Sequence, residues 1–185
     1  MTNCPLRSRS ITMKSKRKTI KKSGVQPIAK PLSPNFLLAD LIFSDTALKK
    51  GIRNTPTKAA LKNLKHLAAT LEQVVELLGH PISISSGYRS KALNAAIGGS
   101  KTSQHTQGLA ADFTCKNFGT PFSVCKKITN SGIRFDQLIL EYGTSRKIAW
   151  VHLGVGPKKR CQVLTICTNS NFSRDGLHRY RKKQA

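Results

Sequence analysis

Two histidines and an aspartate, drawn from two separate segments, are the side chains of this sequence best suited to chemistry. His105 and Asp112 lie seven residues apart, and His152 follows forty residues after Asp112. Catalytic zinc sites are commonly built from three protein ligands, with water in the fourth position. The set therefore predicts a catalytic zinc site, whereas either histidine taken alone would be interpreted as an ordinary structural residue.

Two expected strands would position these ligands. Residues 109–114 and 148–154 each have the length and composition of a short strand, with Asp112 in the first and His152 in the second. His105 precedes the first strand in a polar loop, where a glycine lets the chain turn back. If the two strands are neighbours, the three side chains can point to one place.

The remaining periodicity predicts helices around a sheet. Apolar residues repeat every three or four positions from Thr55-Pro56 to Gly79, which predicts a long amphipathic helix. The strand expected over 135–142 should pair with the one at 148–154 as an antiparallel hairpin. Shorter helices are expected over 36–43, 91–97 and from 120 to about 132, and further strands over 81–86 and 161–167.

Arg89 and Ser103 are candidates for contacting a substrate. Arg89 falls at the junction between an expected strand and an expected helix, where a side chain can face a cleft. Its planar guanidinium suits a carboxylate, either of a substrate or of a nearby acid in the protein. Ser103, two residues before His105, would bond the metal site or the substrate, or simply shape the loop.

Three motifs in this order resemble those of a known family of cell-wall enzymes. The motifs are Ser86-Gly-Tyr-Arg89-Ser, Ser103-x-His105-x-x-Gly108-x-Ala110-x-Asp112 and Trp150-Val-His152. They resemble the zinc D-Ala-D-Ala carboxypeptidase and L-alanyl-D-glutamate endopeptidase family, in the small single-domain form common in phages and bacteria. The resemblance runs from about Leu32 to Gly156.

The resemblance implies a fold, a metal and a role for one arginine. The fold would be α+β, of the hedgehog/DD-peptidase-like type, with a central antiparallel sheet and flanking helices. One zinc ion (Zn2+) per chain would be held by His105, Asp112 and His152. Arg89 would help to hold the peptide substrate.

The general base has to be assigned separately, because the sequence departs from the family here. Many members place an acid a few residues before the last histidine ligand, but residues 148–151 are Ile-Ala-Trp-Val. Glu141 is the only acid between Asp136 and His152, and it lies on the adjacent expected strand. Peptide hydrolysis at zinc needs a base that takes a proton from water, so we predict Glu141 in that role, with Asp136 second. Either acid would otherwise be structural.

The charge of the chain is unevenly spread. Its 32 Lys and Arg against 8 Asp and Glu give a formal net charge of +24. Residues 1–31 hold nine basic residues and no acid, residues 158–185 eight basic and one acidic, and residues 32–157 fifteen basic and seven acidic. This predicts a disordered basic arm over 1–31, a zinc peptidase domain over 32–157, and a basic extension over 158–185 with one added strand and an irregular tail from Asn169. Such tails would bind nucleic acid or an anionic cell envelope, or merely aid solubility.

Neither a secretion signal nor a transmembrane segment is expected. The apolar run of a signal peptide does not follow Met1, and the start is left open between Met1 and Met13. No stretch approaches about 18 apolar residues. The five cysteines contain no C-x-x-C pair, which indicates free thiols in a reducing compartment. We therefore expect a monomer that resides in the host cytoplasm before release, or enters with a virion, and acts at the bacterial cell wall.

These observations predict a zinc metallopeptidase, either a D,D-carboxypeptidase or an endopeptidase, that hydrolyses a peptide bond involving a D-amino acid in bacterial peptidoglycan stem peptides. A bacteriophage endolysin or a bacterial wall-remodelling enzyme would fit. The alternative is a catalytically inactive, zinc-containing module that binds cell wall or nucleic acid. A nucleic-acid-binding protein with an incidental fold is disfavoured, because aromatic residues for base stacking make up only 6% of the chain.

Overall fold

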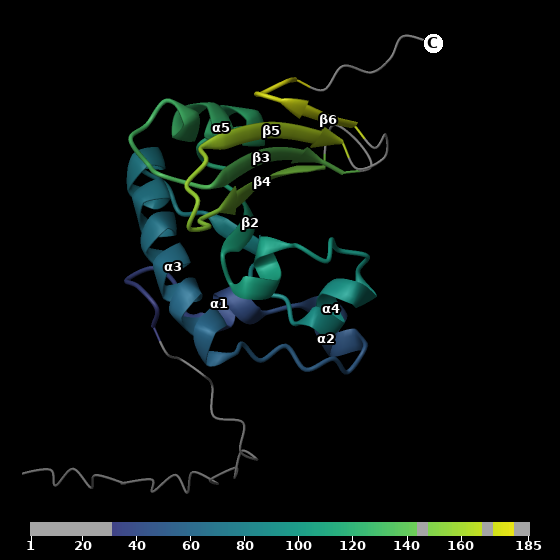
Figure 1. The fold of residues 1–185 in the computed structure, drawn as a ribbon. Helices are drawn as coiled ribbons and strands as arrows, with labels where there is room; N and C mark the ends of the chain where they lie inside the picture. The colour runs from purple at the N-terminus through teal and green to yellow at the C-terminus, as the bar shows by residue number, and fades with distance from the viewer. Residues whose placement is uncertain (1–30, 144–147, 168–171, 180–185) are drawn as a thin grey trace, which may run out of the picture.

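The computed structural model describes residues 31–143, 148–167 and 172–179, which form a six-stranded sheet with helices packed around it (Figure 1). In chain order the elements are α1 (Leu38–Ile42), α2 (Asp45–Lys49), α3 (Lys58–Leu78), β1 (Ser83–Ser86), α4 (Lys91–Ala96), the short 3-10 helix η1 (Gln104–Gln107), β2 (Ala110–Thr114), α5 (Pro121–Thr129), β3 (Gln137–Tyr142), β4 (Ala149–Gly154), β5 (Gln162–Cys167) and β6 (Phe172–Asp175).

The sheet has the strand order β1-β2-β4-β3-β5-β6. Its first four strands in that order are antiparallel, which confirms the α+β fold with an antiparallel centre and the expected hairpin of β3 with β4. The pairing of β3 with β5 is parallel, an orientation that the sequence pattern did not predict. Residues 155–161 pass around the start of β3, because Gln137 is the partner of both Gly154 and Gln162.

The C-terminal part of the chain adds two strands to the sheet. β5 confirms the strand expected there, but β6 lies in the stretch expected to be an irregular tail, so that prediction is wrong between residues 172 and 175. β6 is formed by pairing with β5, and Gly176 continues that pairing by donating to the Val163 carbonyl at 2.8 Å. Residues 1–30 of the basic arm expected over 1–31 lie outside the described residues, as do residues 144–147 and, in the expected tail, residues 169–171 and 180–185.

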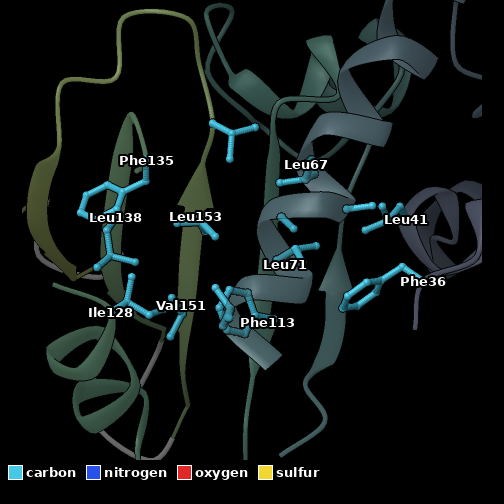
Figure 2. Close-up of a cluster of buried hydrophobic side chains, with 14 of the residues drawn as sticks. Phe36, Leu41, Leu67, Leu71, Phe113, Ile128, Phe135, Leu138, Val151 and Leu153 are labelled. Carbon is cyan, nitrogen blue, oxygen red and sulfur yellow. The ribbon is translucent and has the colours of Figure 1, made fainter. Parts of the chain in front are cut away.

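The hydrophobic core lies between α3, α5 and one face of the sheet. α3 is the long helix expected from the periodicity, and it ends at Gly79, whose φ of 65° is left-handed. Alternate strand residues point into this core (Figure 2), so the residues between them lie on the opposite face. Those that point inward include Phe113, Leu138, Leu140, Val151 and Leu153.

Two helices begin two or three residues later than expected, and in each a side chain accepts a hydrogen bond from an N–H at the observed start. α1 begins at Leu38, where Asp40 accepts a hydrogen bond from the Leu37 N–H at 2.7 Å. α3 begins at Lys58, where the Thr57 hydroxyl accepts one from the Ala60 N–H at 3.1 Å. None of the helices in the described ranges has the length and hydrophobicity needed to cross a membrane.

Candidate metal centre

Asp112 and His152 lie directly opposite each other on adjacent strands. They are Cα partners in the antiparallel pair of β2 and β4, so both side chains leave the sheet on the same face. This face is turned away from the hydrophobic core, yet Asp112 is only 6% exposed and His152 only 7%. The expectation that two neighbouring strands present these residues together is confirmed.

His105 reaches the same place from η1. Gly108 ends η1 with a φ of 69°, and a Cβ added there would lie 2.7 Å from the Ala60 carbonyl oxygen, so η1 packs closely on α3. The His105 ring is buried, and its Nδ1 lies 2.6 Å from the Gly87 carbonyl oxygen. A carbonyl can only accept, so Nδ1 carries a proton and Nε2 of the neutral ring is left free to bind a metal.

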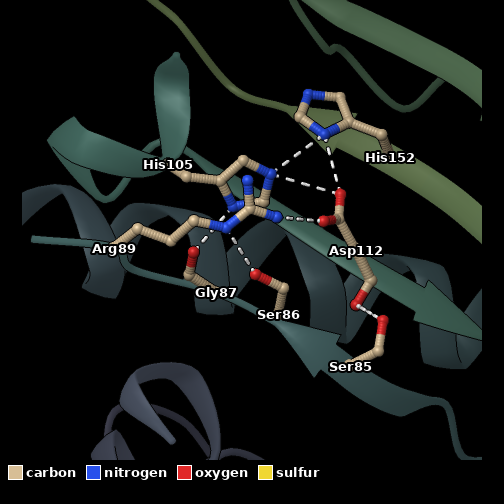
Figure 3. A network of polar contacts seen from close by, with 7 residues as sticks. All are labelled: Ser85, Ser86, Gly87, Arg89, His105, Asp112 and His152. Atoms are coloured by element: carbon tan, nitrogen blue, oxygen red, sulfur yellow. Dashed lines mark hydrogen bonds and ion pairs between the residues drawn. The ribbon is translucent and has the colours of Figure 1, made fainter. Parts of the chain in front are cut away.

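Three potential ligand atoms converge at this point (Figure 3). His152 Nδ1 lies 2.9 Å from Asp112 Oδ1, and His105 Nε2 lies 3.2 Å from each of these two atoms. Ligands of a tetrahedral zinc ion, with bonds of about 2.0–2.2 Å, are roughly 3.4 Å apart. Within the described part of the chain, no other set of three or more His, Cys, Asp and Glu side chains is arranged this way. The donor set and its spacing therefore fit zinc.

The electrostatics of the cluster favour the protonation states that metal binding requires. Burial alone would raise the pKa of Asp112, but the charge interactions and hydrogen bonds with His105 and His152 outweigh it and hold the pKa well below its usual range. Burial lowers the pKa of His105, although Asp112 opposes this. A carboxylate ionised at neutral pH next to an uncharged imidazole can bind a metal without first losing a proton.

Arg89 pairs with the cluster itself. Its Nη2 donates to Asp112 Oδ2 at 2.6 Å and its Nε donates to the Ser86 hydroxyl at 2.8 Å. The ion pair with a protein acid, one of the two interpretations of Arg89, is thus present in the structure, and it turns Oδ1 of Asp112 toward the histidines (Figure 3). Contact of Arg89 with a substrate stays a prediction.

Asn54, which no sequence motif singles out, fixes the loop that carries Arg89. The Arg89 N–H donates to the His105 carbonyl at 3.1 Å, so this loop also holds η1 in place. An asparagine gives no local signal of such a role, because its partners are 12, 34 and 36 residues away. These partners are the carbonyl oxygens of Ile42 and Tyr88, at 2.8 and 3.0 Å from Nδ2, and the N–H of Ser90, 2.7 Å from Oδ1.

Glu141 lies beside the cluster on the same face of the sheet. It is the Cα partner of Trp150, and it precedes Tyr142 at the end of β3. Burial raises the pKa of Glu141, and the negative charge of Asp112 raises it further. A carboxyl group with a raised pKa accepts a proton from water more readily than an ordinary carboxylate does.

Asp136, the second candidate for the base, is engaged elsewhere. Arg160 donates to its carboxylate through Nε at 3.0 Å and Nη2 at 2.8 Å, and Gln104 donates through Nε2 at 2.6 Å. The hydrogen bonds from Arg160 lower the pKa of Asp136 to about 2. A carboxylate with so low a pKa is a poor proton acceptor at neutral pH, which favours the structural interpretation of this residue.

A cleft of about 520 Å³ opens beside the cluster and reaches it at His152 and Ile139. Ser103 lines the cleft, and its carbonyl oxygen accepts hydrogen bonds from the N–H and the hydroxyl of Thr106, at 3.1 and 2.7 Å. The backbone of Ser103 thus shapes η1, while contact of its hydroxyl with a substrate stays a prediction. The other lining residues are Ser100, Thr102, Gln104, Gln107, Leu109, Asp136, Gln137, Gly156, Pro157, Lys158 and Arg160.

Comparison with known proteins agrees with this geometry. The family model described as peptidase M15 matches residues 34–154, which include η1 and the strands that carry Asp112, Glu141 and His152. Comparison with curated proteins gives no match. Because the family model spans more than half of the sequence and the resemblance rests on the same motifs, the chain belongs to the peptidase M15 family, the zinc D-Ala-D-Ala carboxypeptidase-like peptidases.

Proposed function

We propose that this protein is a zinc peptidase that hydrolyses a peptide bond involving a D-amino acid in peptidoglycan stem peptides. The observation that carries the proposal is the convergence of His105, Asp112 and His152 between an open cleft and Glu141. The register of β3 supports an arrangement in which the cluster lies between the cleft and Glu141. Ile139, the Cα partner of His152, lines the cleft, and Glu141 lies two residues further along the same face.

The three ligand side chains would hold zinc through His105 Nε2, Asp112 Oδ1 and His152 Nδ1. A zinc ion bound there would supply a Lewis acid for the scissile carbonyl. Two of the ligands are oriented by neighbours, since Gly87 accepts the Nδ1 proton of His105 and Arg89 binds the other oxygen of Asp112. Such outer contacts fix ring and carboxylate orientation in metal sites.

Glu141 would act as the general base. It takes a proton from the attacking water while the water oxygen bonds to the carbonyl carbon, and it returns the proton to the amide nitrogen as the C–N bond breaks. The products are a carboxylic acid and an amine, which at neutral pH are present as a carboxylate and an ammonium group. The raised pKa of Glu141 suits both steps, because the group must accept a proton and then release it.

Arg89 and Ser103 are proposed as substrate contacts. The side chain of Arg89 is 17% exposed, and its Nε and Nη2 are used by Ser86 and Asp112. Among the described residues Nη1 has no hydrogen bond, so we propose that it binds a substrate oxygen. The planar guanidinium can bind Asp112 and a second carboxylate at different edges.

The test is to measure zinc per chain and to incubate the purified protein with muropeptides, with product identification by mass spectrometry. Glu141→Gln should keep zinc and lower kcat by roughly 10²–10⁴-fold, because only proton transfer is lost. His105→Ala should lose both zinc and hydrolysis. His66→Ala is the matched control, since His66 lies exposed on α3 and both properties should be retained.

The second candidate, a binding module that keeps the fold without catalysis, is favoured by the absence of an acid just before His152. Stoichiometric zinc with no product from any muropeptide would support that module and contradict the peptidase. The mass of the product also decides between release of a terminal D-amino acid and cleavage within the stem.

We place the enzyme in phage lysis or bacterial wall remodelling, as a monomer that stays in a cytoplasm, or travels in a virion, until it reaches the wall. The support for this setting is the family and the uneven basic charge, which suits anionic polymers of the wall or nucleic acid. Detection of the protein in purified virions, or its absence there, separates the two routes.

A further inference from the structure

The cleft extends well beyond the metal cluster. It runs from His152 along the loop before η1 to the segment that follows β4, where Lys158 and Arg160 line it. Its volume of about 520 Å³ is in the range of pockets that hold a small ligand. A bound peptide can therefore place groups several residues away from a bond that lies at His152.

The lining of the cleft carries an excess of positive charge. Asp136 is the one acid among its lining residues, and Lys158 and Arg160 are the lysine and arginine. The charge of Asp136 is already neutralised, because Arg160 binds it through two side-chain nitrogens and its backbone N–H. Lys158 then leaves a net positive charge that faces the cleft.

Arg160 is held in a fixed orientation by a buried acid. Asp136 is only 2% exposed, whereas the Arg160 side chain is 45% exposed. The Arg160 Nε and Nη2 point to Asp136, and within the described residues Nη1 has no hydrogen bond. A guanidinium anchored on one edge offers its remaining N–H groups to a second carboxylate at little cost in conformational entropy.

The floor beneath this arginine is closely built. A Cβ at Gly156 would lie 2.9 Å from both Asp136 Oδ2 and Gln104 Nε2, and a Cβ at Gly154 would overlap Gln104 Oε1. The two glycines thus allow the Gln104 amide to lie against the backbone and to bond Asp136 at 2.6 Å. These contacts keep the carboxylate, and through it Arg160, in place without a ligand.

We propose that Arg160, assisted by Lys158, binds a free carboxylate of the substrate at a distance from the scissile bond, so that the cleft selects anionic peptides. This rests on the proposed peptidase function. Both residues lie beyond residues 34–154, which the family model matches. Asp136 is then a positioning residue for Arg160.

The test compares stem peptides that differ only in one group, with each free carboxylate in turn converted to the carboxamide. For one of these carboxylates, the acid should have a kcat/KM roughly tenfold higher than the amide, as expected for one charge-assisted hydrogen bond. The difference should lie mainly in KM, because the contact is remote from the reacting atoms. Binding of both peptides to the zinc-loaded Glu141→Gln protein gives the same comparison without turnover.

Arg160→Gln and Lys158→Gln should each reduce the preference for the acid, and Lys159→Gln should leave it unchanged. Lys159 is the matched control, because it is exposed like Lys158 and does not line the cleft. If Arg160→Gln impairs folding, Lys158→Gln and the acid–amide comparison with the unmodified protein still test whether the cleft binds a substrate carboxylate. Equal binding and hydrolysis of acid and amide would overturn this inference and leave the peptidase intact, whereas no hydrolysis of any stem peptide would overturn both.

Discussion

Two aspartates in this protein are each buried and each paired with one arginine, yet they suit different tasks. Arg89 occupies only Oδ2 of Asp112, so Oδ1 is left to face the two histidines. Both oxygens of Asp136 are taken, one by Arg160 and the other by Arg160 and Gln104. The number of free carboxylate lone pairs, rather than burial, therefore separates a candidate ligand from a positioning group.

The sequence was enough to assign a role to Asp112 but not to Asp136. Asp112 stands in a motif with His105 at fixed spacing, so its role follows from local pattern. Asp136 depends on Arg160, which is 24 residues away and comes from the segment after β4. Such a pairing produces no periodic pattern in the sequence. Whether Asp136 is a general base or a partner of an arginine could therefore be decided only from the geometry.

Asp136→Asn tests the ion pair through its pH dependence. The folded-state pKa of Asp136, about 2, is below the ordinary value of 3.8, so the pair stabilises the folded state above pH 3.8 and loses this effect as pH falls toward 2. We expect the variant to lose about 1–2 kcal/mol at pH 7, given that the guanidinium is half exposed. Urea unfolding at pH 7 and at steps between pH 5 and 2.5, with chelator present throughout, measures the difference.

The difference between unmodified protein and variant should shrink only below pH 3.8. A constant difference across that range would show that the loss comes from packing rather than from the charge. Asp175→Asn is a suitable control, because Asp175 is exposed on β6 and its substitution should leave stability unchanged at every pH.

Among the helices and strands, hydrophobic periodicity predicted those that pack an apolar face on the core. α3 repeats apolar residues at helical spacing, and β2 and β4 alternate between core and site faces, so their sequences carry the signal. β6 and the parallel register of β5 are set by hydrogen bonds to a neighbouring strand instead. Those partners are supplied by the tertiary structure, which single-strand patterns do not encode.

Gly108→Ala tests whether η1 positions His105. Gly108 and Gly98 have almost the same φ, 69° and 70°, but a Cβ at Gly108 would meet Ala60 O at 2.7 Å, and one at Gly98 would meet nothing within 4 Å. In both variants the alanine must adopt a left-handed backbone conformation, which destabilises the folded state by about 1–2 kcal/mol. Gly108→Ala should cost about 1–3 kcal/mol more from overlap and should also weaken zinc binding, because η1 must shift.

Gly98→Ala is the control for the backbone cost alone, and its zinc affinity should equal that of the unmodified protein. The measurements are urea unfolding of the metal-free proteins and competition for zinc with a chromogenic chelator. Equal zinc affinity in the two variants would mean that η1 can move away from α3 without displacing His105.

At the scale of the whole molecule, the structure shows where the charged ends can be separated from the folded unit. The chain joins the fold at Pro31, which pairs with Leu37, and Asn35 then binds Glu72 of α3 at 2.6 and 2.7 Å. At the other end Arg179 packs over the ring of Phe122, 4.6 Å from its centroid. Cuts after residue 30 and after residue 179 therefore leave these contacts intact.

Removing residues 1–30 deletes nine of the 32 basic residues and no acid, so it tests whether the basic arm binds a polyanion. Log Kobs for duplex DNA falls linearly with log salt concentration. The magnitude of this slope decreases by about 0.9 for each phosphate contact removed. We expect the truncated chain to bind DNA and isolated cell walls more weakly at low salt and with a shallower slope, while kcat and KM for a soluble stem peptide stay the same. Removal of residues 180–185, which takes away three basic residues, should have a smaller effect in the same direction. If the slope for both polymers is unchanged by either cut, the polyanion site lies on the folded unit, because the charge that releases counterions would then still be present in the truncated chain.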